Sequence, residues 1–536
     1  MAVFRELEGN QPVKAKHLKQ RRSLARHGPV TQRVARLAPA VAPGAEREVK
    51  FEVPEAAWEA LALEMSGPHG QPMVLHAIYV DTPAGDLARA RIGVRVRQEA
   101  GRWVQTLKAP GRGPLDRVED EVALGPAHDG APPPAVDLAR HRSQAAQSAL
   151  RAALCAASGQ PLPKVKPLFE VKVQRRVQRI TQGGSVIELA LDEGELLARG
   201  HSRPVRELEL ELVQGELSDL LAVARRWRER WGLWLSTASK AARGNLLVSD
   251  ELFGPAVTAV APQWPAKPRM GEFTAAVLHS CLDQVMGNAS EVAAGSLDDD
   301  HVHQLRVGLR RLRAALHELP SLARDRKRFE PALIDVFRSL GERRDRTHVL
   351  RQIQPLVEAA GGTPVRMPAH FHEGADPGEL VRGNAFQDSM LGLLASAEEA
   401  LRHPGEPVRR TVRASLTRLH KQVTREGRRF TRLSENRQHS VRKRLKRLRY
   451  LSEFVASLYP AKAVERYLSG VKPAQEALGQ YNDEIMAQLL YEEWVGSDPG
   501  ARFGVEWLQA RRAGQAKACR TVLRDLARKR PFWDKR

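Results

Sequence analysis

Charged and apolar residues alternate with a period of two in four stretches of the first half of the chain. In residues 46–53, Glu46, Glu48 and Lys50 alternate with Val49 and Phe51. The same alternation returns at residues 95–97, 119–122 and 207–212. Successive side chains of a strand lie on opposite faces of the sheet, so each stretch predicts a strand with one charged and one apolar face.

Such strands allow two interpretations. A single one is most simply a surface strand, with its charges in water and its apolar side in the core. Four in one region favour the inverse arrangement, in which the charged faces line an enclosed, wet cavity. Carboxylates are hard oxygen ligands for Mg²⁺ or Mn²⁺, and Lys and Arg bind phosphate oxygens. Parallel acidic and basic rows therefore suit a tunnel that holds a metal-bound polyanion.

Helices and further strands are predicted between these stretches. Residues 54–65 and 217–231 carry apolar side chains at helical spacing, and residues 139–157 are also expected to be helical. Trp227, Trp231 and Trp234 are expected to pack in the core. Additional strands are expected at residues 76–81, 93–98, 102–108, 169–180, 185–192 and 206–213. The first half is thus predicted to be a mainly β domain at residues 46–249, preceded by a basic, mobile arm at residues 1–45.

The pattern becomes helical after a proline-containing linker at residues 250–270. Leu305, Leu309, Leu312 and Leu316 form the apolar stripe of one predicted helix. Two motifs of this half occur twice. His303-x-x-Arg306-x-x-x-Arg310-Arg311-x-Arg313 returns at residues 439–449, and Leu340-Gly341-x-x-x-Asp345 returns at residues 478–483.

This duplication predicts two copies of one helical unit, at about residues 271–400 and 401–536. On a helix, positions i, i+3, i+7 and i+10 fall within one sector, so each copy should present one basic face, outside the protein or in a groove. These faces comprise His303, Arg306, Arg310 and Arg313 in the first copy and His439, Arg442, Lys446 and Arg449 in the second.

The composition narrows the class of partner. The 536 residues carry a net charge of +22, which indicates polyanionic ligands such as polyphosphate, nucleic acid or anionic lipid. Few aromatic residues disfavour nucleic acid. Cys155, Cys281 and Cys519 are too widely spaced for a disulfide framework, and no apolar run of about 18 residues predicts a membrane span. We expect a cytoplasmic protein, with polyphosphate granules as an alternative location.

The first half resembles the CYTH family, the triphosphate-tunnel enzymes. The family's opening signature, E-x-E-x-K, stands at Glu46, Glu48 and Lys50, and its closing signature, S-K-x-x-R-G, stands at residues 239–244. Other family elements keep their order between the two, namely residues 79–83, Arg95-x-Arg97, Lys108, the acidic strand 119–121, Asp192 and the run Glu207-x-Glu209-x-Glu211. Many weak matches in one order make the resemblance specific.

The CYTH resemblance implies an antiparallel β-barrel tunnel that hydrolyses a triphosphate with Mg²⁺ or Mn²⁺. It implies catalytic roles for Glu46, Glu48 and Lys50. The implied metal ligands are Glu46, Glu48, Asp192, Glu209 and Glu211, and the implied triphosphate-binding residues are Lys50, Arg95, Arg97, Lys108, Lys172, Arg175, Lys240 and Arg243. On strand 169–176, strict alternation favours Lys172 with Arg176, whereas the motif match favours Arg175. Glu119 and Glu121 are either ligands or partners of nearby Arg.

The second half resembles the CHAD family, the conserved-histidine α-helical domains, through both copies of its two motifs. This resemblance implies two pseudo-repeated helical bundles at residues 271–536, whose basic faces bind inorganic polyphosphate. The combined prediction is an α+β protein with a β-barrel tunnel and an all-α domain, acting as a metal-dependent inorganic triphosphatase with a polyphosphate-binding module. The alternatives are a non-catalytic polyphosphate-binding granule protein and, less favoured, a nucleic-acid binder.

Overall fold

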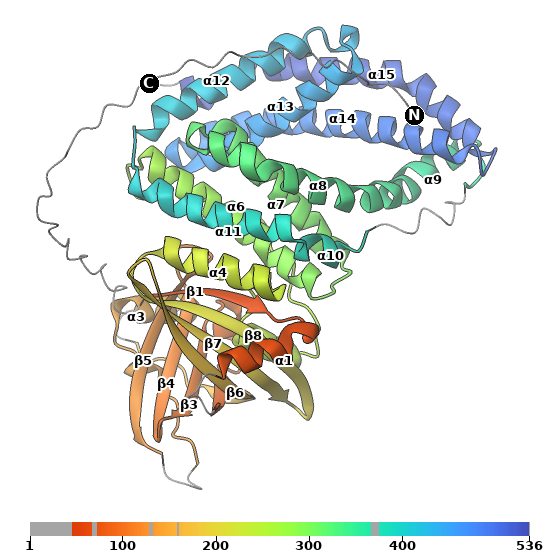
Figure 1. Ribbon diagram of the computed structural model, residues 1–536. Coiled ribbons are helices and arrows are strands. Elements are labelled where there is room, and N and C mark those ends of the chain that lie inside the picture. Colours follow the sequence, from red (N-terminus) through yellow and green to blue (C-terminus); the bar gives the residue numbers. More distant parts are fainter. Residues whose placement is uncertain (1–44, 67–71, 128–131, 158–159, 366–374, 535–536) are drawn as a thin grey trace, which may run out of the picture. The chain divides into compact units, whose positions relative to one another are not determined.

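The strands of the first half form one antiparallel sheet that closes into a barrel (Figure 1). The computed structural model describes residues 45–66, 72–127, 132–157, 160–365 and 375–534, so the predicted arm lies almost wholly outside the described residues. The strands are β1 Ala45–Glu52, β2 Met73–Asp81, β3 Gly93–Glu99, β4 Arg102–Pro110, β5 Asp116–Pro126, β6 Lys166–Gln182, β7 Ser185–Ala198, β8 His201–Gln214 and β9 Trp234–Leu235.

The strand order explains the closure. It runs β5-β4-β3-β2-β6-β7-β8-β1-β9, and an additional pairing of β1 with β5 completes an eight-stranded ring. The short β9 is added outside the ring, on the edge of β1. A closed barrel leaves its strands without free edges, so that the interior is separated from bulk water.

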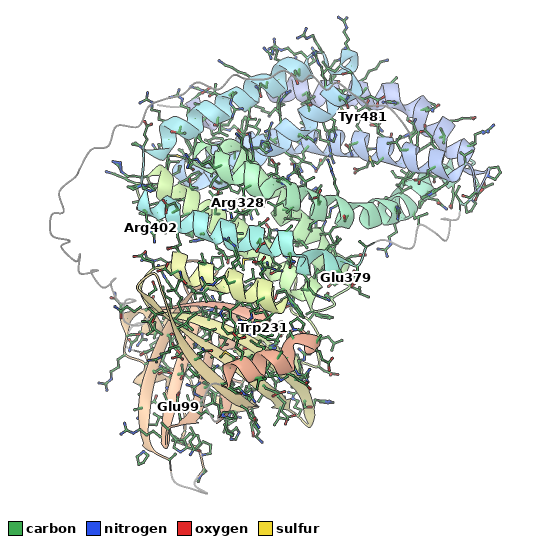
Figure 2. All side chains as sticks on the ribbon, viewed as in Figure 1. Glu99, Trp231, Arg328, Glu379, Arg402 and Tyr481 are labelled. Carbon is green, nitrogen blue, oxygen red and sulfur yellow. The ribbon has the colours of Figure 1, made fainter. Side chains whose placement is uncertain are left out.

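The charged strand faces point into the barrel, and the apolar faces point out. Glu46 and Lys50 are only 5% and 8% exposed, although both carry charge. Phe51 and its outward neighbours on β1, β7 and β8 pack beneath helix α4, Leu217–Trp231. Trp231, labelled in Figure 2, packs half-buried against this core. The inverse arrangement of the alternating strands is therefore the one that the barrel adopts.

One end of the interior is filled by apolar side chains. Tyr79 and Phe169 stack with their ring centroids 4.7 Å apart, and Leu247 of helix α5, Lys240–Val248, packs against the same cluster. A Cβ at Gly244 would lie 2.1 Å from the Phe169 ring, which explains the glycine of the S-K-x-x-R-G signature. The charged part of the interior is thus a chamber with an apolar plug.

Shorter helices complete the first half. They are α1 Glu55–Met65, α2 Asp86–Arg89 and α3 Gln144–Ala153. The expected helix at residues 139–157 is therefore shorter than predicted, because a 3₁₀ turn at Leu138–Arg140 precedes it and Ser143 caps α3 by accepting from the Ala146 amide. Asp81 accepts hydrogen bonds from the amides of Leu87 and Ala88, so the motif at residues 79–83 anchors α2.

The second half is helical throughout its described residues. Its α-helices are α6 Met270–Ala293, α7 Asp299–Glu318, α8 Ala323–His348, α9 Gln354–Ala359, α10 Pro377–Arg382, α11 Asn384–Arg402, α12 Val408–Gly427, α13 Glu435–Phe454, α14 Ala461–Trp494 and α15 Ala501–Ala527. Helices α6, α7, α8 and α11 pack together, as do α12 to α15. The stripe at Leu305, Leu309, Leu312 and Leu316 is buried, as predicted. None of the helices in the described residues is long and apolar enough to span a membrane.

Candidate functional site

An acidic ladder runs along the inner faces of β1, β8 and β7. Glu48 lies opposite Glu211, and Lys50 lies opposite Glu209. Glu207 lies opposite both Glu52 on β1 and Asp192 on β7. Like charges on directly opposed strand positions are destabilising. An interior with opposed carboxylates therefore needs cations nearby, and basic side chains of the chain itself supply them.

Three carboxylates form a deep cluster at the centre of the chamber. Asp192, Glu207 and Glu209 each offer an oxygen within 4.8 Å of the others. The Lys240 ammonium lies among them, 2.7 Å from Asp192 Oδ2 and 3.1 Å from Glu209 Oε1, and it also donates to Glu207. Burial opposes the charge of Lys240, but these carboxylates outweigh burial and raise its pKa above the usual value.

Two guanidinium groups complete the deep cluster. Arg175 donates from Nε and one terminal nitrogen to Asp192, at 2.7 and 2.6 Å, and reaches Glu209 at 2.8 Å. Arg243 donates to Glu207. Burial alone would raise the pKa of Glu209, but Lys240 and Arg175 hold it well below its ordinary value. The deep cluster is therefore charged and compensated, with three carboxylates facing three cations.

A second carboxylate set lies towards the chamber's mouth, where compensation is weaker. Lys108 lies 2.7 Å from both oxygens of Glu46 and 3.4 Å from Glu119. Burial, followed by repulsion from Glu46, raises the pKa of Glu211 to about 7. Burial also raises the pKa values of Glu46 and Glu48. A cation bound among these carboxylates would stabilise their charged forms and lower their pKa values.

The mouth opens into a pocket of about 400 Å³. Its lining comprises Ala45, Glu46, Glu119, Asp120, Glu121, Ser143 and Glu211. Several phosphate groups fit a space of this size. Its carboxylates repel a bare polyanion, so a divalent ion at the mouth would favour entry of an anion.

The remaining basic residues of the CYTH set face the same chamber, with one exception. Arg95 donates to the Tyr79 hydroxyl at 3.3 Å, and Arg97 is 7% exposed beside it on β3. Lys50 donates to the backbone carbonyl of Ala238. Lys172 instead projects outward, half-exposed, and pairs with Glu170 at 3.4 Å. The structure therefore groups Arg175 with the deep cluster and separates Lys172 from it.

Sequence reasoning left Glu207 out of the site. Its side chain is buried and bonds both Lys240 and Arg243. The signal was present, because Glu207 shares the alternation of Glu209 and Glu211 and therefore the same strand face. Asp192, Glu207 and Glu209 lie close enough together to share one metal ion. Among the described residues, Glu46, Glu48 and Glu211 are not part of any such set.

The donor chemistry of the deep cluster fits a divalent ion. The group offers one oxygen from each of three carboxylates, and carboxylate oxygens are ligands that Mg²⁺ and Mn²⁺ accept. The Lys240 ammonium lies where such an ion would be shared by the three side chains. The Lys240 ammonium supplies the positive charge at this point, so a divalent ion would bind all three carboxylates only by displacing that ammonium.

The basic faces of the two helical copies meet, because α7 packs against α13. Burial and the neighbouring Arg442 and Arg310 lower the pKa of Lys446 to about 6, which places residues of both copies around one amine. Arg306 is buried, lies over the Phe337 ring and donates to the Leu340 carbonyl at 3.0 Å. Of the two predicted positions, outside the protein or in a groove, the outside does not hold for Arg306, whose side chain is buried against the Leu340-Gly341 motif.

Other motif residues are held by carboxylates or lie near the surface. Arg313 pairs with Glu330 at 3.0 Å, and Arg449 pairs with Glu453 at 2.6 Å. His303 is half-buried, whereas His439 is exposed. Burial and the neighbouring Lys443 lower the pKa of His439. The centre of this basic cluster is accordingly formed by Arg306, Arg310, Arg442 and Lys446.

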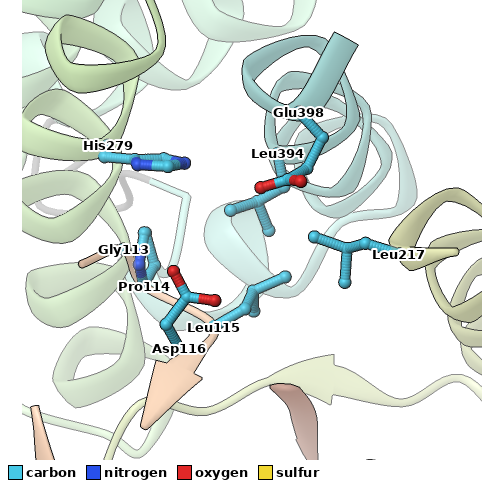
Figure 3. A pocket seen from close by; sticks show the side chains of 8 residues that line it. All are labelled: Gly113, Pro114, Leu115, Asp116, Leu217, His279, Leu394 and Glu398. Carbon is cyan, nitrogen blue, oxygen red and sulfur yellow. The ribbon is translucent and has the colours of Figure 1, made fainter. Parts of the chain in front are cut away.

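A smaller pocket is lined by residues of β5, its preceding loop and helices α4, α6 and α11 (Figure 3). Its volume is about 10 Å³, which holds little more than one water molecule. Burial lowers the pKa of His279, so this side chain adds no strong cation to the pocket. The chamber of the barrel is the better candidate site.

Comparisons with known proteins found similarities to both halves of the chain. The match to the curated inorganic triphosphatase of Haemophilus influenzae is 29% identical over 181 residues, 34% of this chain. It spans about half of the relative, 48% of its length. The CHAD domain of Ricinus communis is 24% identical and covers 50% of this chain and 96% of that one, with a TM-score of 0.43. A Hippeastrum protein described as a putative adenylyl cyclase with a dominant triphosphatase activity is 22% identical. The match covers 39% of this chain and 97% of that one, with a TM-score of 0.26.

Two family models match the chain in succession. The CYTH model matches residues 44–244, which contain the barrel, and the CHAD model matches residues 276–492, which contain both copies of the helical motifs. The charged chamber and the paired basic helices thus lie within these matches. The chain carries a CYTH domain followed by a CHAD domain.

Proposed function

We propose that the CYTH domain hydrolyses inorganic triphosphate in a metal-dependent reaction and that the CHAD domain binds polyphosphate. The observation that carries the proposal is the deep cluster, in which two buried carboxylates, a partly buried third and three cations share one chamber. The similarity to an inorganic triphosphatase supports the choice of substrate.

The chain's cations are proposed to bind the phosphate oxygens. They are Lys50, Arg95, Arg97, Lys108, Arg175, Lys240 and Arg243, all on the inner side of the barrel. Arg175 and Lys240 already bond to carboxylates, so a triphosphate has to compete with Asp192 and Glu209 for them. Binding of the anion is therefore favoured when these carboxylates are engaged by another cation.

The carboxylates are proposed to hold that cation. Asp192, Glu207 and Glu209 would form the deep site. Glu46 and Glu211, which line the mouth pocket, and Glu48, which lies opposite Glu211, would add negative charge nearby without belonging to that group of three. A divalent ion bound there supplies charge neutralisation and Lewis acidity. Phosphoryl transfer needs little beyond such positioning and charge stabilisation, both of which a closed chamber strengthens by excluding water.

The CHAD domain is proposed to bind a longer chain of the same chemistry. Motif cations of both copies gather around Lys446, and burial together with repulsion from these cations lowers the pKa of Lys446. A flexible polyanion relieves that repulsion at several points at once. A duplex nucleic acid is too wide to follow one narrow row of side chains on α7 and α13.

A substrate panel tests the proposal. Phosphate release is measured from tripolyphosphate, ATP and thiamine triphosphate, each with Mg²⁺, Mn²⁺ or a chelator. We expect tripolyphosphate to be cleaved with the highest kcat/KM. Faster cleavage of ATP would contradict the inorganic substrate, and binding of polyphosphate without any hydrolysis would support the non-catalytic alternative.

A further inference from the structure

A short segment of the barrel domain, leading into the CYTH closing signature, contacts the helical half. Residues 234–239, here called the strap, lead directly into Lys240. The strap pairs with β1, since Trp234 lies opposite Glu52, Leu235 lies opposite Phe51 and the Ser236 amide donates to the Lys50 carbonyl at 3.0 Å. Its last residue, Ser239, caps α5 by accepting from the Ala242 amide at 3.1 Å.

The strap determines the surroundings of three chamber cations. The Lys50 ammonium donates to the Ala238 carbonyl within it. Lys240 and Arg243 lie in the first turn of α5, immediately after the Ser239 cap. A shift of the strap would therefore move Lys240 and Arg243 and remove the acceptor of Lys50.

Within the part of the chain that the structure describes, no strand pairs with the outer edge of the strap, and side chains of the helical half provide acceptors for its amides instead. The Leu235 amide donates to Gln387 Oε1 of α11 at 2.9 Å, and the Thr237 amide donates to Ser290 Oγ of α6 at 3.0 Å. Leu235 is buried and Thr237 partly so. Buried amides without acceptors are strongly unfavourable, so these two bonds fix the position of the edge.

The two acceptors are themselves held in place. Gln387 is 2% exposed, and its Nε2 donates to the Val381 carbonyl at 2.6 Å. Ser290 Oγ lies 3.5 Å from Ser236 Oγ. The Arg382 guanidinium lies 5.3 Å from the centre of the Trp234 ring and covers the start of the strap. Water cannot readily replace either acceptor in such a packed setting.

We propose that Gln387 and Ser290 are positioning residues of the tunnel site, which hold the strap so that Lys50, Lys240 and Arg243 face the substrate correctly. The helical half then has two roles, as a polyanion-binding surface and as part of the framework of the hydrolytic chamber. This inference rests on the proposed hydrolysis of triphosphate.

The test uses the full chain with Gln387→Met and Ser290→Ala combined. Both substitutions remove an acceptor and keep most of the packed volume. Because small displacements of reacting groups reduce rates steeply, we expect kcat for tripolyphosphate to fall about 10- to 100-fold. Ser290→Thr, which keeps the hydroxyl, should retain wild-type kcat. Asp388→Ala is the matched control, since Asp388 also lies on α11 but contacts Arg228 of α4 at 2.9 Å and not the strap.

Hydrogen exchange of the strap supplies a readout that does not depend on turnover. We expect faster exchange of the Leu235 and Thr237 amides in the double variant than in Asp388→Ala, at a similar melting temperature. A double variant with the kcat and exchange of Asp388→Ala would overturn the inference. If the wild type hydrolyses nothing, the proposed function fails, whereas faster strap exchange together with weaker tripolyphosphate binding in the double variant would still support the positioning role.

Discussion

The two halves of the molecule both gather cations, but they balance them differently. In the barrel, Arg175 and Lys240 bond to buried carboxylates at 2.6 to 3.1 Å. Around Lys446, the described side chains with the strongest charge effect are Arg442, Arg310 and Arg306, together with the carboxylate of Asp483. Under the proposed function, carboxylates beside cations in the barrel allow metal-assisted chemistry on a phosphate, whereas the arginine-rich surroundings of Lys446 bind a phosphate without cleaving it. If the two halves act as proposed, the comparison teaches that the same basic side chains bind phosphate in both halves but take part in its cleavage only where carboxylates accompany them.

The largest expected effect comes from removing a carboxylate of the chamber. Glu209→Gln keeps the size of the side chain but removes a hard-oxygen ligand and the charge that faces Arg175 and Lys240. We expect turnover of tripolyphosphate to fall at least ~10²-fold, measured by phosphate release at saturating Mg²⁺. Glu48→Ala and Glu211→Ala should lower the turnover of tripolyphosphate by a similar factor. Glu170→Gln, a half-exposed carboxylate on the outside of β6, is the control and should remain active.

The next effect separates two basic residues of the same strand. Arg175→Ala removes a guanidinium bonded to Asp192 inside the barrel, whereas Lys172→Ala removes an outward ammonium. We expect Arg175→Ala to lower kcat/KM for tripolyphosphate by ~10- to 100-fold, since charge-assisted bonds to phosphate are lost. Lys172→Ala should change it less than about twofold. Equal losses in the two variants would mean that general surface charge, and not the chamber, controls the reaction.

A smaller effect is expected on polyphosphate binding by the helical half. Replacing Arg310 and Lys446 together by Ala in the full chain should flatten the plot of log K against log salt by about one to two units, since each lost phosphate contact releases fewer counterions. Hydrolysis of tripolyphosphate should be unchanged. Lys472→Ala, on the exposed side of α14 beside Glu476, is the control. An unchanged slope in the double variant would remove the basic cluster from the binding site.

The smallest expected effect is the uptake of a proton by Lys446 when polyphosphate binds. The pKa of Lys446 is about 6 because of burial and nearby arginines, so its amine is mostly neutral at pH 7.5. A bound polyanion favours the charged form and raises this pKa, so affinity should weaken as the pH rises above about 6. Calorimetry in buffers of different ionisation enthalpy should show uptake of up to about one proton per site at pH 7.5. The uptake should vanish in Lys446→Met, and its persistence there would assign it to another group.

The strand faces and the helical copies could be predicted from the sequence because both are periodic. Alternation predicted that Glu46, Glu48 and Lys50 share a face, and the limits of α4 were predicted correctly at Leu217 and Trp231. Alternation alone did not show which face of β6 points inward. Phe169, Val171 and Val173 pack inside the barrel's apolar plug, and Arg175 follows them inward.

The contacts of the strap were beyond sequence reasoning. Gln387 accepts from the Leu235 amide across 152 residues of chain, and a lone glutamine in a helix carries no pattern that predicts such a bond. Burial of Arg306 was also missed, since its acceptor is a backbone carbonyl of Leu340 on another helix. Both features depend on how elements distant in sequence pack, which local periodicity does not encode.

The most direct test of the central claim is a Mg²⁺ titration of tripolyphosphate hydrolysis by the full chain, with binding of long polyphosphate measured on the same preparation. The account predicts no phosphate release in chelator, a rise to saturation with Mg²⁺, and polyphosphate binding in both conditions. Phosphate release that persists in chelator, or polyphosphate binding with no release at any Mg²⁺ concentration, would contradict it.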